Sequence, residues 1–377
     1  MSTFAEYMEQ VLYGPEGYYS AGAAKSGRTG DYFTAPDVGA VFGRLLADIF
    51  LSWKDKLRVD PFTLIEAGAG EGRLAADILN AEPFRYIAIE RSLSRREALK
   101  RIPTVDVYSD LVSAPPMEGV LFGNELIDAF PVHRVRMKNG RSEEAYVNSP
   151  RPRHAGEGWG EGTVLPSSQP SPDTRSGEGV QIVWSSPSTP RLQSYFERLG
   201  IALPDDYETE VNLAMADWLK EAAQVLQKGL VVLIDYGRPA HEYYAPERTR
   251  GTLRAFSKHR VSSEVLDPGT VDLTADVDFT SLALDAREAG FVPLAFMEMG
   301  SFLMSAVSAY GRMGGSANPI FDVADTPTRR HANLSLRYLL HPEGLGAAFH
   351  VLILGKNIDP AEWMFEHNRM RRLGLPL

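Results

Sequence analysis

The chain has 377 residues, 44% of them hydrophobic, and a formal net charge of -10 at pH 7. This length and apolar content suffice for one large core with an accessory lobe, and the acidic balance argues against a nucleic-acid binder that works by neutralising phosphates. The absence of cysteine excludes disulfides and thiolate metal sites, and no apolar run reaches the roughly 18 residues of a membrane span. Because the N-terminal residues also lack a basic leader, we expect a cytoplasmic protein.

Strand-like apolar runs alternate with helical patterns along most of the chain. The runs span Phe62–Glu66, Tyr86–Glu90, Val105–Ser109, Val120–Asn124, Val231–Asp235 and Phe349–Gly355. This alternation predicts an α/β fold in which a mostly parallel sheet carries helices on both faces. Every run before residue 240 ends in polar or acidic residues, and ligands of such sheets bind at the carboxyl ends of the strands. We therefore expect a cleft at that edge, although polar residues also simply begin loops.

The segment Leu64–Leu79 combines a short buried strand, a glycine-rich turn and an amphipathic helix. The glycines Gly68, Gly70 and Gly72 let the backbone adopt positive φ and approach a ligand closely, and the helix that follows presents unpaired N–H groups. Glu90, at the end of the next strand, can accept hydrogen bonds from both hydroxyls of a ribose. This pattern is typical of a site for a nucleotide-like cofactor.

Two cofactor classes compete for this turn. The dinucleotide pattern G-x-G-x-x-G requires a small residue where the chain has Arg73. The observed spacing, with Glu66 at the end of the strand, suits S-adenosylmethionine better. A methyltransferase is therefore favoured, and an NAD-dependent dehydrogenase stays as the disfavoured alternative.

Residues 149–179 differ in kind from the rest of the chain. They repeat a Gly-Glu-Gly element and have too few apolar residues to offset the entropy of ordering. The segment lies between two strand-like pieces, Glu144–Asn148 and Val180–Trp184. We expect it to be the disordered tip of a hairpin and not a phosphate-binding loop.

Several ordered motifs resemble one known family over nearly the whole chain. They lie at Phe4–Glu9, Leu12–Tyr19, Gly30–Pro36, Phe42–Gly43, Asn124–Val132, Asp235–Gly237 and Arg250–Leu253, together with the glycine turn. The chain is similar to the MidA-like S-adenosylmethionine-dependent methyltransferases, which include the mitochondrial complex I assembly methyltransferase and its bacterial relatives. Two departures are the glycine-rich insertion and Ala69, where the family turn often has proline.

The resemblance implies a class I (Rossmann-like) methyltransferase fold with a mostly parallel seven-stranded sheet and accessory insertions. The cytoplasm expected above would then be that of a bacterium, like that of the family's bacterial relatives. The expected division of the chain is a helical N-terminal and lid region (1–60), a cofactor-binding domain in two parts (61–138 and 210–300), an accessory insertion (139–209), a helical substrate-side region (301–345) and a final strand with a tail (346–377).

Four residues near the first two strands can be given roles toward S-adenosylmethionine. Gly68 and Gly70 would let the backbone approach the methionine part of the cofactor, and Glu90 would take the ribose hydroxyls. Glu66 would orient the turn or the ligand ammonium, directly or through water. All four lie at the expected ligand-binding edge of the sheet.

Three further residues complete the expected cofactor set. Asp110, after the third strand, could accept from the adenine amino group, or could instead cap a helix before Leu111. We also assign Asn124, at the end of the fourth strand, to cofactor binding. Thr34 belongs to the Gly30–Pro36 motif, which the resemblance indicates as a lid over the sulfonium.

The segment Asn124–Asp128 follows the fourth strand, where methyltransferases of this architecture handle the methyl acceptor. Its two carboxylates, Glu125 and Asp128, suit a cationic acceptor, because they can hold a guanidinium and localise its charge on part of the group. Arginine is the best-matched side chain, and the resemblance implies protein arginine methylation, with a quinone-side complex I subunit as an analogous substrate. Asp128 could alternatively cap a helix that begins at Ala129.

Two other polar residues are catalytic candidates. Asp235 closes a buried strand and could orient Tyr236 or a basic acceptor, and His241 could take the proton released on transfer. A surface histidine in a polar loop is the more frequent situation for His241. No spaced set of acidic and histidine residues indicates a metal, and methyl transfer from a sulfonium needs none.

The C-terminal third contains a methionine-rich stretch, Phe296–Met304, and a basic helix, Arg329–Leu340. Such methionines usually fill a core, but on a helix beside a cleft they can adapt to a protein partner. A third functional hypothesis is therefore an assembly chaperone that keeps the cofactor fold without essential catalysis. The sequence leaves the oligomeric state open, a homodimer included.

Overall fold

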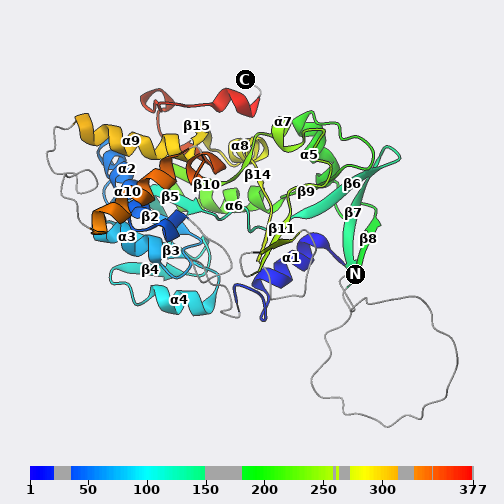
Figure 1. Cartoon of the computed structure of the whole chain (residues 1–377), viewed down its shortest axis with the longest axis horizontal. Helices are drawn as coiled ribbons and strands as arrows, with labels where there is room; N and C mark the ends of the chain where they lie inside the picture. Colours follow the sequence, from blue (N-terminus) through cyan, green and yellow to red (C-terminus); the bar gives the residue numbers. More distant parts are fainter. Residues whose placement is uncertain are drawn as a thin grey trace, which may run out of the picture.

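The computed structural model describes residues 1–20, 35–148, 181–257, 260–262, 272–312, 327–341 and 343–375. The protein consists of a large α/β part and a smaller part built on an antiparallel sheet (Figure 1). Thr34 and the expected hairpin tip over 149–179 lie outside the described residues. None of the described helices is both long and apolar enough to cross a membrane.

The central sheet has the strand order β15-β16-β10-β5-β2-β3-β4. Its strands are β2 (Thr63–Ala67), β3 (Arg85–Ile89), β4 (Val105–Tyr108), β5 (Met117–Asn124), β10 (Leu226–Arg238), β15 (Val292–Glu298) and β16 (Phe349–Lys356), and β14 (Val277–Asp278) adds to the end of β10. The five strands from β4 to β10 are parallel to one another, and β16 runs antiparallel to both β10 and β15. The predicted mostly parallel seven-stranded sheet is therefore confirmed.

β15 was not predicted from the sequence. Part of the methionine-rich stretch, Phe296–Glu298, belongs to this strand, and the helix begins only at Met299. Pro293 hides the strand signal, because proline cannot donate to a sheet and is tolerated at edge positions. The strand indeed lies at the edge of the sheet, where the C-terminal segment covers it: Arg369 N–H donates to Phe296 O (2.7 Å).

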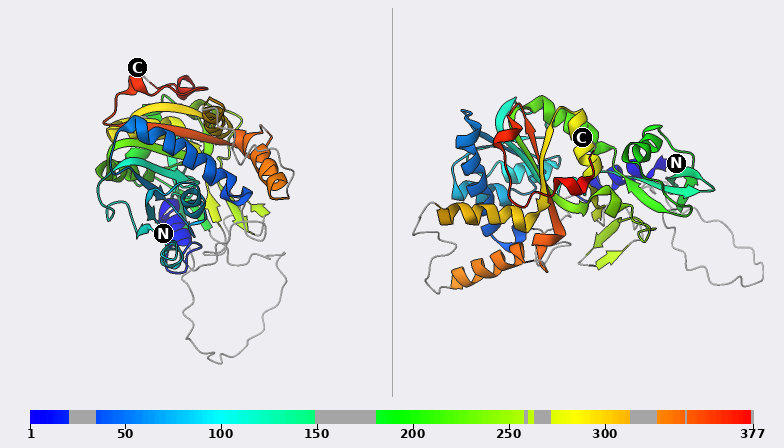
Figure 2. Two further views of the ribbon diagram at one scale, coloured as in Figure 1. Left: turned by 90° about the vertical axis from the view of Figure 1, so that its left-hand side faces the viewer. Right: turned by 90° about the horizontal axis from the view of Figure 1, so that it is seen from above.

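Helices cover both faces of the central sheet, as Figure 2 shows from two further directions. Strand residues alternate between the two faces, so that Leu64 and Val120 join one core while Ile65 and Leu121 join the other. The first core is closed by α2 (Val41–Leu57), α3 (Arg73–Ala81), α9 (Met299–Arg312), α10 (Pro327–Leu340) and α11 (Leu345–Ala348). The second core is closed by α6 (Ala214–Val225) and α8 (Phe279–Glu288). The predicted α/β layering is thus present.

The smaller part is built on a second sheet that includes the predicted hairpin. It contains β1 (Ser2–Thr3), β6 (His133–Lys138), β7 (Arg141–Asn148), β8 (Gln181–Ser185) and β9 (Glu208–Val211), with α1 (Phe4–Tyr13) and α5 (Arg191–Leu199) packed nearby. β7 and β8 pair antiparallel on either side of the undescribed tip. A third sheet contains β11 (Arg254–Ser257), β12 (Arg260–Ser262) and β13 (Asp272–Thr274). Two further helices are α4 (Leu93–Leu99), which follows β3, and α7 (Ala240–Tyr243), which follows β10.

Candidate active site

The glycine turn, residues 68–72, leaves the end of β2 and leads into α3. Its glycines all have positive φ, namely 73° at Gly68, 56° at Gly70 and 84° at Gly72, as the sequence predicted. A Cβ on Gly68 would lie 2.9 Å from the Leu126 side chain, whereas a Cβ on Gly70 would meet nothing within 4 Å. The turn therefore packs tightly on one side and opens on the other, which leaves room for a ligand against the backbone of Gly70.

Glu90 links this turn to the loop after β3. One carboxylate oxygen accepts from Gly70 N–H (2.8 Å) and the other from Ser92 N–H (2.8 Å). A carboxylate has about four lone-pair sites, so the buried Glu90 can still accept further hydrogen bonds. Its proposed role toward ribose hydroxyls is compatible with these contacts, which fix the direction of the side chain.

Glu66 is almost fully buried in β2, with 4% of its surface exposed. It accepts a hydrogen bond from the Tyr86 hydroxyl (2.6 Å) on the neighbouring strand. Burial raises the pKa of Glu66 to about 8, Glu90 adds to the shift, and the Tyr86 hydrogen bond opposes it. Of the two roles expected for Glu66, these contacts favour orientation of the glycine turn over contact with the ligand ammonium.

Asp110 lies in an exposed loop after β4. It accepts from the Ser113 hydroxyl (2.6 Å) and N–H (2.8 Å) and from the Ser109 hydroxyl (2.7 Å), and these hydrogen bonds lower its pKa. The pattern resembles helix capping, but Leu111 and its neighbours form only a turn. Its expected contact with an adenine remains a prediction, and Thr34 lies outside the described residues.

The 124–130 loop begins where β5 ends. Glu125 has a left-handed backbone (φ 51°), and its N–H donates to Ile234 O (2.9 Å) on β10. One Glu125 carboxylate oxygen accepts from the Asn124 amide (3.1 Å) and from Ala35 N–H (3.2 Å). Glu125, the residue expected to bind the acceptor, thus contacts Ala35. Ala35 belongs to the Gly30–Pro36 motif, which the resemblance indicates as a lid.

Asn124 carries an unusual feature at this point. Its side-chain oxygen is buried and has no hydrogen-bond partner within the described part of the chain. A buried acceptor without a partner costs free energy comparable to a lost hydrogen bond. The atom is therefore suited to a donor group that a ligand would bring.

Asp235, which lies in β10 shortly before the strand ends at Arg238, holds the 124–130 loop by its backbone. One of its oxygens accepts from the N–H groups of Leu126 (3.1 Å), Ile127 (2.8 Å) and Asp128 (3.2 Å), and the other accepts from Tyr236 N–H (2.9 Å). Burial raises its pKa, and Glu125 adds to the shift, whereas the backbone hydrogen bonds oppose it. Asp235 acts on the loop backbone, so we describe it as a positioning residue.

Asp128 is buried beside two further carboxylates. Its pKa is raised well above the ordinary range, first by burial and then by Asp235 and Asp272, and Arg254 opposes the shift. The alternative in which Asp128 caps a helix is wrong, because Ala129 begins no helix and the chain forms a turn there. Asp128 and Glu125 therefore belong to one loop with an excess of negative charge.

Sequence reasoning missed several residues around this loop. The Tyr13 hydroxyl donates to Ala129 O (3.0 Å), and the Tyr19 hydroxyl donates to Asp272 (2.6 Å). Arg254, paired with Asp276 (2.6 Å), has its guanidinium carbon 5.7 Å from the centre of the Tyr236 ring. Tyr13 and Tyr19 lie in the Leu12–Tyr19 motif, but only the tertiary structure brings this motif next to the 124–130 loop.

His241 is placed differently from the other candidates. It lies on the short helix α7 with a 60% exposed side chain, and its Nε2 is 3.4 Å from Glu242. His241 is therefore a surface histidine, the more frequent situation for this residue type, and we leave it out of the proposed site. Within the described ranges, no group of three or more histidine and acidic side chains could hold a metal ion.

The family comparison matches the segment that contains this site. A family model described as "Putative S-adenosyl-L-methionine-dependent methyltransferase" matches residues 43–297, which is more than half of the chain. Among curated relatives, a mouse protein named protein arginine methyltransferase NDUFAF7, mitochondrial, is 26% identical over 395 residues, which cover 93% of this chain and 80% of the relative. A Drosophila melanogaster homologue with the corresponding name is 26% identical over 343 residues, covering 79% and 70%.

Solved structures agree with this assignment. A Burkholderia thailandensis protein in complex with S-adenosyl-homocysteine has a TM-score of 0.78 and 26% sequence identity, covering 98% of this chain and 92% of that one. A native structure from the same organism, with 24% identity and a TM-score of 0.75, covers 98% and 91% and shows the same fold. The class I methyltransferase fold expected from the sequence is confirmed.

The residues of the site fit S-adenosyl-L-methionine. The open side of Gly70 gives space beside backbone N–H groups, Glu90 keeps free acceptor capacity, and the orphaned Asn124 oxygen offers an acceptor for an ammonium or hydroxyl donor. The dehydrogenase alternative is set aside, because family and fold both point to methyl transfer. The chain belongs to the family of S-adenosyl-L-methionine-dependent methyltransferases, and S-adenosyl-L-methionine is its cofactor.

Proposed function

We propose that the protein methylates a guanidinium nitrogen of arginine in another protein. The observation that carries this proposal is the contact between the glycine turn and a loop that bears two carboxylates. Leu126, between Glu125 and Asp128, packs against Gly68. A cationic acceptor held by this loop would therefore lie next to the cofactor turn.

The carboxylates suit a guanidinium for chemical reasons. A bidentate carboxylate contact orients a planar guanidinium and concentrates its charge on the bound nitrogens. The remaining nitrogen keeps more lone-pair character and can attack. Glu125, held by Asn124 and by the backbone of Ala35, is the residue that we assign to this contact.

The reaction balances without a further reactant. Bound S-adenosyl-L-methionine supplies an electrophilic methyl group on a sulfonium. One carbon–nitrogen bond forms, one carbon–sulfur bond breaks, and the guanidinium loses one proton. We assign that proton to Asp128, which burial and its acidic neighbours make a stronger base whenever it is ionised.

The relatives support arginine as the methyl acceptor but do not identify the substrate protein that contains it. The mouse and Drosophila relatives are named protein arginine methyltransferases, at about one-quarter identity. We propose a respiratory complex I subunit on the quinone side as the protein substrate in an organism that has complex I, and the cytoplasm as the compartment. The support for the complex I subunit is the resemblance to the family alone.

Labelled methyl transfer tests the proposal. The purified protein is incubated with methyl-labelled S-adenosyl-L-methionine and a lysate from cells that lack the gene, and the labelled protein is hydrolysed to amino acids. We expect label in methylarginine with the wild type and none with Glu125→Gln. Glu118→Gln, an exposed position near the start of β5, serves as the control that keeps activity.

Two results would contradict the arginine assignment. Label in a different amino acid or in a small molecule would show another acceptor. Cofactor binding without transfer to any lysate component, combined with normal partner assembly by Glu125→Ala, would favour the chaperone hypothesis.

A further inference from the structure

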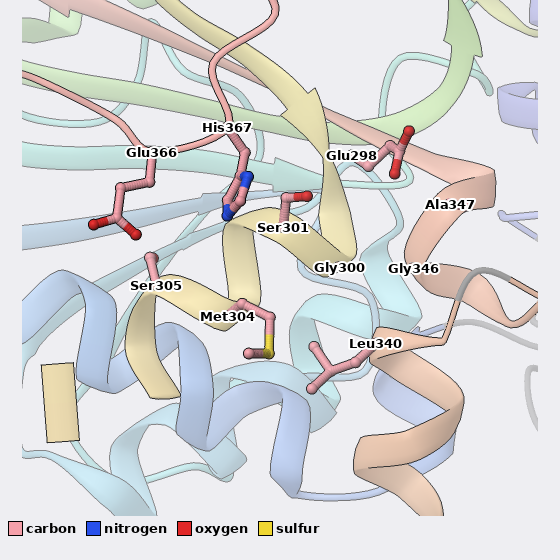
Figure 3. Close-up of a pocket in the computed structure, with 10 residues that line it drawn as sticks. All are labelled: Glu298, Gly300, Ser301, Met304, Ser305, Leu340, Gly346, Ala347, Glu366 and His367. Carbon is pink, nitrogen blue, oxygen red and sulfur yellow. The ribbon is translucent and has the colours of Figure 1, made fainter. Parts of the chain in front are cut away.

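A cavity lies at the C-terminal end of β15, outside the residues assigned above. It has a volume of about 250 Å³ and lies between the start of α9, the α10–α11 connection and the C-terminal segment (Figure 3). Its lining includes Glu298, Ser301, Met304, Leu340, Glu366 and His367. No residue of the cofactor set or of the 124–130 loop lines it.

The sheet register places Glu298, at one end of this pocket, two strands away from Asp235, which holds the 124–130 loop. Asp235 on β10 pairs with His350 on β16, and His350 pairs in turn with Glu298 on β15. Neighbouring strands lie about 4.8 Å apart, so the Cα atoms of Asp235 and Glu298 are separated by about 10 Å. An extended peptide rises about 3.3 Å per residue and would cover this distance in roughly three residues.

The lining combines negative charge with an apolar wall. Figure 3 shows Glu298 and Glu366 at opposite ends of the pocket lining, with His367 and Ser301 between them and Met304 and Leu340 below on α9 and α10. Among the described lining residues there is no lysine or arginine. Glu298 already accepts a hydrogen bond from the guanidinium of Arg369, at the rim.

This combination matches one class of side chain. Arginine and lysine pack a long aliphatic stem on apolar atoms while the charged end reaches polar groups. Met304 and Leu340 would contact the stem, and the carboxylates and the Ser301 hydroxyl would receive the N–H donors. An acidic side chain would instead lie close to a carboxylate at either end of the pocket.

We propose that this pocket binds a second cationic side chain of the substrate protein, about three residues along the chain from the methylated arginine. The inference rests on the proposed function, because it takes the peptide to enter over the 124–130 loop. It makes the pocket a specificity site that selects arginine-rich or lysine-rich segments. The methyl transfer itself would not require the pocket.

Peptide binding to the protein loaded with S-adenosyl-homocysteine tests the pocket without turnover. The probes are two fluorescein-labelled Gly-Ser peptides of identical composition, each with two arginines, placed three residues apart in one and ten apart in the other. We expect the closely spaced peptide to bind wild type about tenfold more tightly, which corresponds to about 1.4 kcal/mol. Ser301→Phe, which fills the pocket, and Glu366→Gln should each remove most of this preference.

Glu362→Gln is the matched control, because it removes an exposed charge from the same C-terminal segment outside the pocket lining. Circular dichroism checks that each variant is folded. Equal binding of the two peptides to wild type, no binding at millimolar concentration, or an unchanged preference in both pocket variants would overturn the proposal.

The two proposals fail in distinguishable ways. Labelled methyl transfer to arginine of the same peptides is measured separately from binding. Spacing-dependent binding without any methylarginine would contradict the proposed function and leave the cation pocket standing. Methylarginine formation without a spacing preference would contradict the pocket alone.

Discussion

The two halves of the site are built in different ways. The glycine turn is held by residues about 20 positions away, within one strand–helix–strand unit: Gly68 and Ala69 donate to Ile89 O, and Gly70 donates to Glu90. The 124–130 loop is held by residues far away along the chain, since Asp235 lies more than 100 positions from the N–H groups that it binds. The cofactor half is therefore held mainly within one strand–helix–strand unit, whereas the acceptor half depends on distant parts of the fold.

The largest expected effect comes from Gly68→Val. A valine at φ 73° is strained, and its Cβ would lie 2.9 Å from Leu126, so both the turn and its contact with the 124–130 loop would be displaced. We expect calorimetric titration to show no binding of S-adenosyl-L-methionine.

Gly140→Val separates this effect from backbone strain. Gly140 has φ 70° in the turn between β6 and β7, and a Cβ there meets nothing within 4 Å. This control should lose a similar amount of stability yet bind the cofactor with unchanged affinity. Loss of binding in both variants would mean that general destabilisation is the cause.

Asp235→Asn tests whether the acceptor half depends on distant support. The amide presents only one acceptor oxygen and adds N–H donors next to a cluster of backbone N–H groups, so we expect a loss of about 3 kcal/mol in the free energy of unfolding. Methyl transfer should fall sharply while cofactor affinity stays within a few-fold of wild type. Denaturant titration measures the free energy of unfolding, and calorimetry measures the affinity for the cofactor. A loss of cofactor affinity as large as the loss of methyl transfer would contradict the separation of the two halves.

Glu66→Gln should change how stability depends on pH. The folded-state pKa of Glu66 is raised to about 8, so its neutral form is the stable one in the folded protein, and the stability that it contributes is present below its unfolded pKa and lost as pH rises through 8. Between pH 5 and 8 the free energy of unfolding of wild type should fall relative to Glu66→Gln by up to about 1.4 kcal/mol per pH unit. Parallel denaturant titrations at several pH values measure this difference. Identical slopes would show that Glu66 is ionised in the folded protein at pH 5.

Tyr13→Phe is the mildest change to the acceptor half. It removes only the hydrogen bond to Ala129 O, so we expect a loss of about 1 kcal/mol and a few-fold slower methyl transfer. Tyr146→Phe removes a comparable bond to Ser186 O on the exposed hairpin and should leave transfer unchanged. An equal effect of both substitutions on transfer would contradict a specific role for Tyr13.

The same contrast explains what could be predicted from the sequence. The strands, the layering and the glycine turn were predictable, because alternating apolar residues and positive-φ glycines are local signals. β15 was not predicted, because Pro293 and the methionines interrupt the strand-like pattern of its sequence. Its free edge is hydrogen-bonded to Asn368 and Arg369, which are distant in the chain. The glycine-rich residues 149–179 contain no apolar pattern from which a strand or helix could be predicted.

The candidate site divides along the same line. Glu90 and Glu125 could be proposed from their places at strand ends, and the structure puts them in contact with the turn and with Ala35. The contribution of Asp272, like that of Tyr13, could not be predicted, because nothing in the sequence indicates that the N-terminal segment and β13 meet beside Asp128. His241 is the opposite case. Its residue type is suited to proton transfer, but the structure places it on the exposed surface of α7.

The measurement that tests the central claim most directly is the comparison of Glu125→Gln with wild type in cofactor binding and in methyl transfer. The account predicts an unchanged dissociation constant for S-adenosyl-L-methionine by calorimetry together with a loss of labelled methylarginine in the lysate assay. Loss of cofactor binding in this variant would contradict the division into two halves. Retention of full methyl transfer would show that the acceptor is held elsewhere.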